Sequence, residues 1–129
     1  MADLGNADIN QRLAAYGLTN TSFPSFVTSA NDAAAILARL QGHKDFDNDS
    51  VALLLGVMKE QIYRSGLPLG MPDAVVADKV GFSETPNYHD VAVVTLPNGR
   101  EYIVAVLSQG AGSRQIANLG AEIYAVLMK

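Results

Sequence analysis

One lysine stands where it could take part in chemistry. Lys79 follows the apolar segment Val75–Ala77 and is separated from Gly81 by one residue, and a polar loop and a second apolar segment come next. A lysine in such a strand has two interpretations. Its side chain points to solvent while its neighbours point inward, or it belongs to an active site of which this strand carries one half.

The other polar candidates have simpler structural explanations. His89 and Asp90 are adjacent on an expected strand, so their side chains point to opposite faces and cannot form a catalytic pair. His43 follows a helix end, where a partly positive imidazole suits the helix dipole. The alternating aspartates of "DFDND" lack the glycine and the final glutamate of a calcium loop, which favours helix capping. We therefore expect no metal site and no cofactor.

The composition is that of a globular protein. Of 129 residues, 49% are hydrophobic and 17% are charged, and the net charge is −4. No basic patch indicates binding to nucleic acid or to an anionic membrane. The absence of cysteine excludes disulfides, thiolate metal ligands and cysteine nucleophiles. No apolar run reaches the ~20 residues of a membrane span, and the first ten residues do not resemble a signal peptide.

The first half of the chain is expected to be helical. Hydrophobic spacing predicts helices over residues 6–18, 30–41 and about 48–64. Ser29 and Asp32 have the spacing of a capping box at the second helix. The candidate caps of the third helix are Asp47, Asn48 and Asp49. The segment "SGLPLGMPD" is expected to break all regular structure.

The second half has the pattern of a small sheet closed by a helix. The expected strands are 75–82, 89–96 and 101–108, and the final helix covers about 114–128 with Ser113 as its cap. "PNG" (97–99) predicts a tight turn between the last two strands. Three helices, then three strands, then one helix indicate an α+β fold. We expect one incomplete domain over 1–129, with a helical part (1–72) and a sheet with its closing helix (73–129).

Several segments occur in an order that is typical of one enzyme family. Lys79-Val80-Gly81 is preceded by "VVAD" and followed by "HDVAVVTLPNGREYIVAVLSQG". Upstream lie "LGNADINQRLAAYGL", "VTSANDAAAILARL" and "LLGVMKEQIYRSGLPLGMPD". In this order they resemble the C-terminal part of class A β-lactamases and penicillin-binding proteins, which are serine hydrolases with Ser-x-x-Lys, Ser-Asp-Asn and Lys-Thr-Gly motifs. The resemblance covers nearly the whole chain and implies a partial β-lactamase/transpeptidase-like fold.

The resemblance implies roles for four residues. The family's third-motif lysine faces the nucleophile, supplies positive charge for the substrate carboxylate and eases proton transfers, and this catalytic role falls on Lys79. The family's next residue binds the carboxylate through a hydroxyl, which Val80 cannot supply. Beyond Gly81 the strand pairs with the substrate, and the backbone N–H of Phe82 would serve the oxyanion hole. The implied substrate-binding residues are thus Val80, Gly81 and Phe82.

Other parts of the family's active site are absent from the chain. It contains no Ser-x-x-Lys and no Ser-Asp-Asn, and Ser29-Ala30-Asn31 is better explained by helix capping. It also has no Glu followed by Leu-Asn in the position of the class A deacylating glutamate. The resemblance therefore implies a complete enzyme that acts on β-lactams or D-Ala-D-Ala peptidoglycan stems. It also implies that this chain is inactive alone.

The resemblance also implies an unpaired strand. The family's sheet has five strands from both ends of the chain, of which this chain would supply the last three. An exposed apolar edge favours association, so we expect a homo-oligomer, strand pairing through 101–108, or a rearranged segment over that edge. A separate chain that supplies the nucleophile is a further possibility. The alternative function is a non-catalytic interaction module on the same scaffold. Family members are usually extracytoplasmic.

Overall fold

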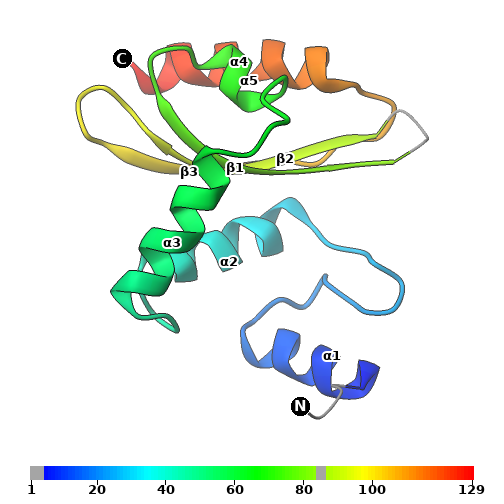
Figure 1. The fold of residues 1–129 in the computed structure, drawn as a ribbon. Coiled ribbons are helices and arrows are strands. Elements are labelled where there is room, and N and C mark those ends of the chain that lie inside the picture. Colours follow the sequence, from blue (N-terminus) through cyan, green and yellow to red (C-terminus); the bar gives the residue numbers. More distant parts are fainter. Residues whose placement is uncertain (1–4, 84–86) are drawn as a thin grey trace.

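Three antiparallel strands form a sheet with helices on both faces (Figure 1). The computed structural model describes residues 5–83 and 87–129. The strands are β1 (Val75–Phe82), β2 (Tyr88–Thr95) and β3 (Glu101–Val106), in the order β1-β2-β3. The helices are α1 (Asn6–Ala15), α2 (Ala30–Gln41), α3 (Asn48–Lys59), α4 (Leu67–Gly70) and α5 (Ser113–Leu127). The predicted α+β class is confirmed.

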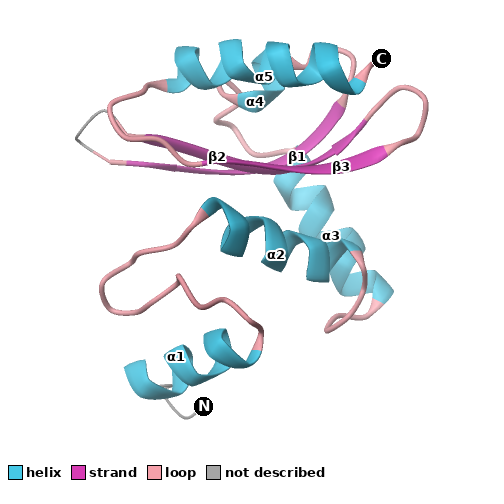
Figure 2. Cartoon of the chain, turned by 180° about the vertical axis from the view of Figure 1, so that it is seen from behind, coloured by secondary structure: helices cyan, strands magenta, loops and turns pink. Residues whose placement is uncertain are grey.

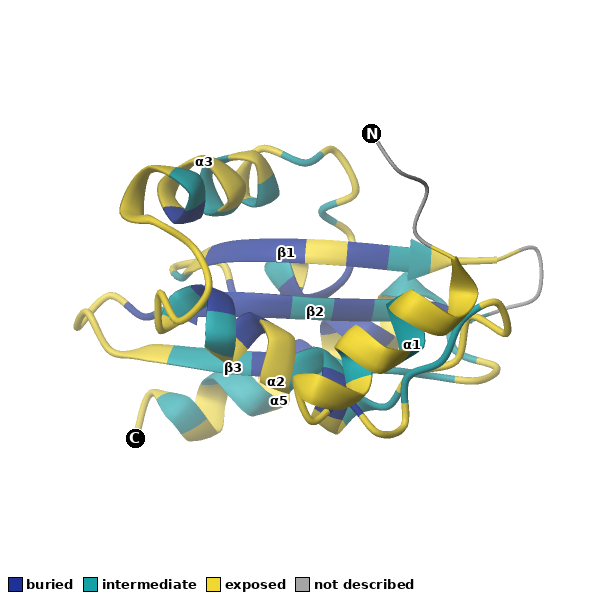
Figure 3. Cartoon of the chain, turned by 90° about the horizontal axis from the view of Figure 1, so that it is seen from below, coloured by how far each residue is buried: buried dark blue, intermediate teal, exposed yellow. Residues whose placement is uncertain are grey.

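The sheet separates two hydrophobic cores. Helices α4 and α5 cover one face, whereas α2 and α3 lie on the other and α1 lies beyond α2, away from the sheet (Figures 1 and 2). Because successive strand residues point to opposite faces, β1 contributes Val76 and Val80 to the α4/α5 core and Ala77 to the α2/α3 core. Figure 3 shows the burial concentrated in the strands, while α1 has no buried residue.

Polar side chains fix the starts of α2 and α3. Ser29 Oγ accepts a hydrogen bond from the Asp32 N–H at 3.1 Å, as the spacing predicts. Asp47 caps α3 in the same way, by accepting from the N–H three residues later. The Asp32 carboxylate accepts from the Asn20 N–H and from the Thr21 hydroxyl, and the Thr21 bond is the main cause of its lowered pKa. Asp32 thereby ties the preceding loop to α2.

The segment after α3 differs most from the prediction. Helix α3 ends at Lys59 and not near Arg64, because the side chains of Gln61 and Arg64 turn to Asp78 on β1. The sequence also predicts a break throughout "SGLPLGMPD", but α4 forms there. Pro68 occupies its first turn, where the missing N–H of proline costs nothing.

Two smaller differences occur at the ends of β3 and α5. β3 ends at Val106 and not at residue 108, because the Ser108 side chain bonds the backbone N–H and carbonyl of Tyr88. The cap of α5 is Gly112 in place of Ser113, and its N–H donates to the Gln115 side chain at 3.1 Å. None of the helices in the described ranges is long and apolar enough to cross a membrane.

Candidate functional site

Lys79 lies on an open edge of the sheet. β1 pairs with β2, where Lys79 is opposite Val91, and the outer edge of β1 has no strand partner among residues 5–83 and 87–129. Strand alternation puts Lys79 on the α2/α3 face together with Ala77. Its side chain is exposed, and its Nζ donates a hydrogen bond to the Val80 carbonyl. An exposed positive charge therefore lies on a strand edge that no other described strand pairs with.

A pocket of about 450 Å³ surrounds this position. It is lined by Gln61, Ile62, Tyr63, Lys79, Val80 and Phe82. The Tyr63 and Phe82 rings pack edge to face with their centroids 5.2 Å apart, and Phe82 stacks on Tyr88 at 6.3 Å. One cation among apolar and aromatic walls suits a ligand that carries an anionic group beside an apolar one.

The other predicted site residues take different positions. Val80 is only 6% exposed, and its side chain packs in the α4/α5 core although the residue also lines the pocket. Gly81 is opposite His89, and a Cβ at Gly81 would meet that ring at 3.7 Å, an ordinary contact. Phe82 is 57% exposed and forms a wall of the pocket. The structure thus places Lys79, Val80 and Phe82 around one pocket, with Gly81 between them on β1.

None of the remaining polar candidates lines this pocket. His89 Nδ1 accepts a hydrogen bond from the Ser108 N–H at 3.1 Å, whereas Asp90 is buried on the opposite face of β2. Asp45 pairs with Arg39 at 2.6 Å, and Asp47 caps α3. In the described part of the chain, no three His, Cys, Asp or Glu side chains are grouped so that they could hold a metal ion.

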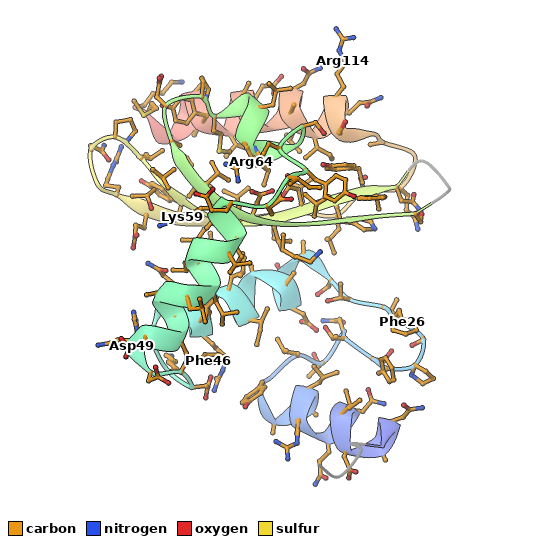
Figure 4. All side chains as sticks on the ribbon, in the orientation of Figure 1. Phe26, Phe46, Asp49, Lys59, Arg64 and Arg114 are labelled. Carbon is orange, nitrogen blue, oxygen red and sulfur yellow. The ribbon has the colours of Figure 1, made fainter. Side chains whose placement is uncertain are left out.

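A buried charge cluster lies directly behind Lys79. Asp78 has a fully buried side chain, and it pairs with Arg64 at 2.6 Å and accepts a hydrogen bond from Gln61. Arg64 lies on the α4/α5 side of the sheet (Figure 4). Burial raises the pKa of Asp78, and the positive charge of Arg64 opposes that rise. Asp78 thereby connects the strand that carries Lys79 to the segment that carries Gln61 and Tyr63.

A second buried carboxylate, Asp90, lies on the neighbouring strand. One of its oxygens accepts a hydrogen bond from the Leu67 N–H at 2.7 Å, at the start of α4. Burial, the largest cause, raises the pKa of Asp90 to about 7. Neither carboxylate was predicted from the sequence to belong to the site. Strand alternation between Val76 and Val80 could have placed Asp78 on a core face, but nothing in the sequence indicated Arg64 as its partner.

Comparison with known proteins assigns the chain to a family. The model of the β-lactamase enzyme family matches residues 1–127. The chain belongs to this family. No curated protein matches it. Among solved structures, PBP-A is 25% identical with a TM-score of 0.88, and the match covers 96% of this chain and 52% of PBP-A.

Two further structures extend the comparison. The L158E mutant of PBP-A, described as an acyl-enzyme complex with penicillin G, has a TM-score of 0.87 at 25% identity, covering 96% of this chain and 52% of its own. A β-lactamase from Chitinophaga pinensis shares the fold, with a TM-score of 0.84 at 22% identity and coverage of 95% and 56%. This β-lactamase-family chain thus spans about half the length of the solved relatives that it matches.

Proposed function

We propose that this chain is the C-terminal portion of a serine hydrolase that recognises β-lactams or D-Ala-D-Ala peptides. The observation that carries the proposal is Lys79 in an aromatic-walled pocket at the open edge of β1. Both ligand classes carry a carboxylate, which an ammonium group can bind through a charge-assisted hydrogen bond. An unpaired strand edge can also bind an extended peptide through main-chain hydrogen bonds. The penicillin G complex of the PBP-A mutant supports the same ligand class.

We also propose that the chain is catalytically inactive alone. Acyl transfer needs a nucleophile activated by a neighbouring base, and the sequence has no Ser-x-x-Lys. Val80 supplies no hydroxyl for the substrate carboxylate, so Lys79 would hold that group with little help. The nucleophile would come from the part of the family fold that this chain does not contain, either in the same polypeptide or in a separate one.

Benzylpenicillin is expected to bind weakly and without acylation. In NMR spectra of ¹⁵N-labelled chain, millimolar ligand should shift the amide signals of Tyr63 and Phe82 reversibly. The intact mass should stay unchanged, whereas the L158E mutant of PBP-A, as a positive control, should gain the mass of the drug. The reason is that the pocket has a cation and apolar walls but no activated hydroxyl.

Two variants separate the site from general surface binding. Lys79→Ala should abolish these shifts, whereas Lys59→Ala, an exposed lysine at the end of α3 (Figure 4), should leave them unchanged. Equal binding by Lys79→Ala would contradict the assignment of the pocket. A stoichiometric mass increase would contradict the inactivity, because some serine of this chain would then have to be activated.

The unpaired edge of β3 supports a second candidate function, a non-catalytic interaction module. β3 pairs only with β2 within the described residues, so its outer edge presents backbone groups without a strand partner. Such edges pair with other chains unless they are blocked. In this function the fold serves assembly, and two copies would pair through β3 (Glu101–Val106), within the predicted 101–108.

A single lysine substitution on β3 tests self-association through this strand. Ala105→Lys places a charge on the edge strand and should weaken dimerisation at least ~10-fold, measured by sedimentation equilibrium. Ala35→Lys, on the exposed side of α2, should leave the dimer unchanged. A parent chain that is monomeric at all concentrations would argue against the interaction module and leave the hydrolase proposal intact.

A further inference from the structure

Two buried carboxylates are diagonal neighbours behind the Lys79 pocket. In the β1–β2 register Asp78 is opposite Ala92, and Asp90 is opposite Val80. Asp78 and Asp90 therefore share the α4/α5 face of the sheet, and both are 0% exposed. We propose that Asp78 and Asp90 together hold one proton, and that this proton-sharing pair keeps the wall of the Lys79 pocket in place.

The hydrogen bonds indicate which carboxyl group of the pair is ionised and which one carries the proton. The two Asp78 oxygens accept from Arg64 and Gln61, as suits an ionised carboxylate. Asp90 Oδ2 accepts from the Leu67 N–H, but Asp90 Oδ1 is buried and has no partner within the described structure. An ionised carboxylate with one unpaired buried oxygen is unfavourable, and a second negative charge nearby makes it more so. The proton therefore resides mainly on Asp90.

A close backbone approach leaves Asp90 no room to turn toward water. A Cβ on Gly66 would lie 2.2 Å from Asp90 Oδ2 and 2.9 Å from the Tyr88 ring, so only glycine fits there. The start of α4 thus covers the carboxyl group. This enclosure agrees with the raised pKa of Asp90, about 7, for which burial is the largest cause and the charge of Asp78 a smaller one.

The charged and titratable groups around the pair come from several elements. Arg64 in the loop and Lys79 on β1 supply positive charge that favours ionisation, and α4 has no ionisable side chain. The tyrosines that belong to or pack against the same core are Tyr88, Tyr102 and Tyr124. In the described residues, the pair of Arg64 with Asp78 is the only ion pair that either carboxylate makes. A second ionised carboxylate would therefore compete for a single partner.

This competition connects the proton to the pocket. Gln61 and Tyr63 line the pocket, and Gln61 and Arg64 hold their segment to Asp78. While Asp90 is neutral, Arg64 pairs only with Asp78, and the pocket wall formed by Gln61 and Tyr63 stays in place. When Asp90 loses its proton to solvent, Arg64 faces two negative charges and the wall loosens. The device depends only on these contacts and operates whether or not the pocket binds a β-lactam.

The chemical shift of the Leu67 amide should follow the protonation of Asp90 directly, because this N–H donates to the Asp90 carboxyl group. Its ¹H–¹⁵N signal, followed by NMR from about pH 5 to about pH 9, should titrate with a midpoint at about 7. Amide exchange at Ile62 and Tyr63, corrected for its intrinsic pH dependence, should accelerate above the same midpoint. Asp90→Asn keeps the shape, the neutral charge and an acceptor for Leu67, so it should remove both effects.

The pH dependence of the free energy of unfolding is an independent test, and the proposal fixes the direction of the change. Asp90 binds its proton more tightly in the folded chain, with a pKa of about 7, than at the reference value of 3.8. Stability should therefore fall as the pH rises between these values and level off above them. Asp90→Asn should flatten this slope, while Asp73→Asn, an exposed control, should keep it. A Leu67 signal that does not titrate near neutral pH, or an unchanged slope in Asp90→Asn, would overturn the proposal.

Discussion

The Gly70→Ala variant should unfold at a much lower denaturant concentration than the parent chain. The backbones of α4 and α5 touch at this glycine, where a Cβ would lie 2.2 Å from the Ala117 carbonyl oxygen and 2.6 Å from the Ala121 nitrogen. Both atoms belong to the backbone of α5 and cannot turn aside. The two helices must then separate and loosen Leu67, which is 0% exposed. We expect a loss of about 3 kcal/mol or more in the free energy of unfolding.

A second glycine supplies the matched control. Gly56 lies in α3, and a Cβ there would meet nothing within 4 Å. Gly56→Ala should therefore stabilise the chain by about 0.5–1 kcal/mol, because alanine is the better helix former. Urea unfolding followed by circular dichroism measures both variants. Equal stabilities of Gly70→Ala and the parent would show that α4 and α5 are not in backbone contact.

Replacing Arg64 with methionine should be the second most damaging change. Methionine keeps much of the arginine side-chain length but leaves the fully buried Asp78 carboxylate without its cation. Breaking a buried ion pair from one side costs about 3 kcal/mol, because the remaining charge is uncompensated. Without Arg64 the already raised pKa of Asp78 should rise further. The loss should consequently be larger in alkaline than in acidic solution, where Asp78 can take up a proton.

An exposed arginine tests whether the effect comes from the ion pair. Arg114, in the first turn of α5, points away from the molecule (Figure 4), and Arg114→Met should change stability by less than ~0.5 kcal/mol. Adding Asp78→Asn to Arg64→Met should recover part of the loss, because no buried charge then remains. If both arginine variants unfold alike at every pH, Asp78 does not depend on Arg64.

The elements that local signals specify could be predicted from the sequence. The start of α2 follows from Ser29 and its spacing to Asp32, and the β2–β3 hairpin follows from "PNG" between two β-branched segments. These features depend on residues close together in the chain. The segment 60–70 was predicted wrongly because it is held by hydrogen bonds to Asp78 and Asp90, which lie further along the chain.

In the candidate site, too, the residues with local sequence signals could be predicted and those that depend on distant contacts could not. Lys79 could be identified from its strand, its spacing to Gly81 and the family resemblance. The opposite wall of its pocket, Gln61 to Tyr63, could not be identified, because the hydrophobic period continues through these residues as if α3 did. For Asp90 the sequence excluded only a catalytic pair with His89. Its enclosure becomes apparent only when Gly66 is seen against it.

The two buried carboxylates also bear on strand register. β1 and β2 face a hydrophobic core on each side, so their apolar residues alone would tolerate a slip by one position. Such a slip would turn Asp78 or Asp90 toward Leu37 and Leu40, away from Arg64 and the Leu67 N–H. A carboxyl group without a hydrogen-bond partner in that core would cost several kcal/mol. Asp78 and Asp90 therefore select one alignment of the hairpin, and so determine which face of the sheet Lys79 occupies.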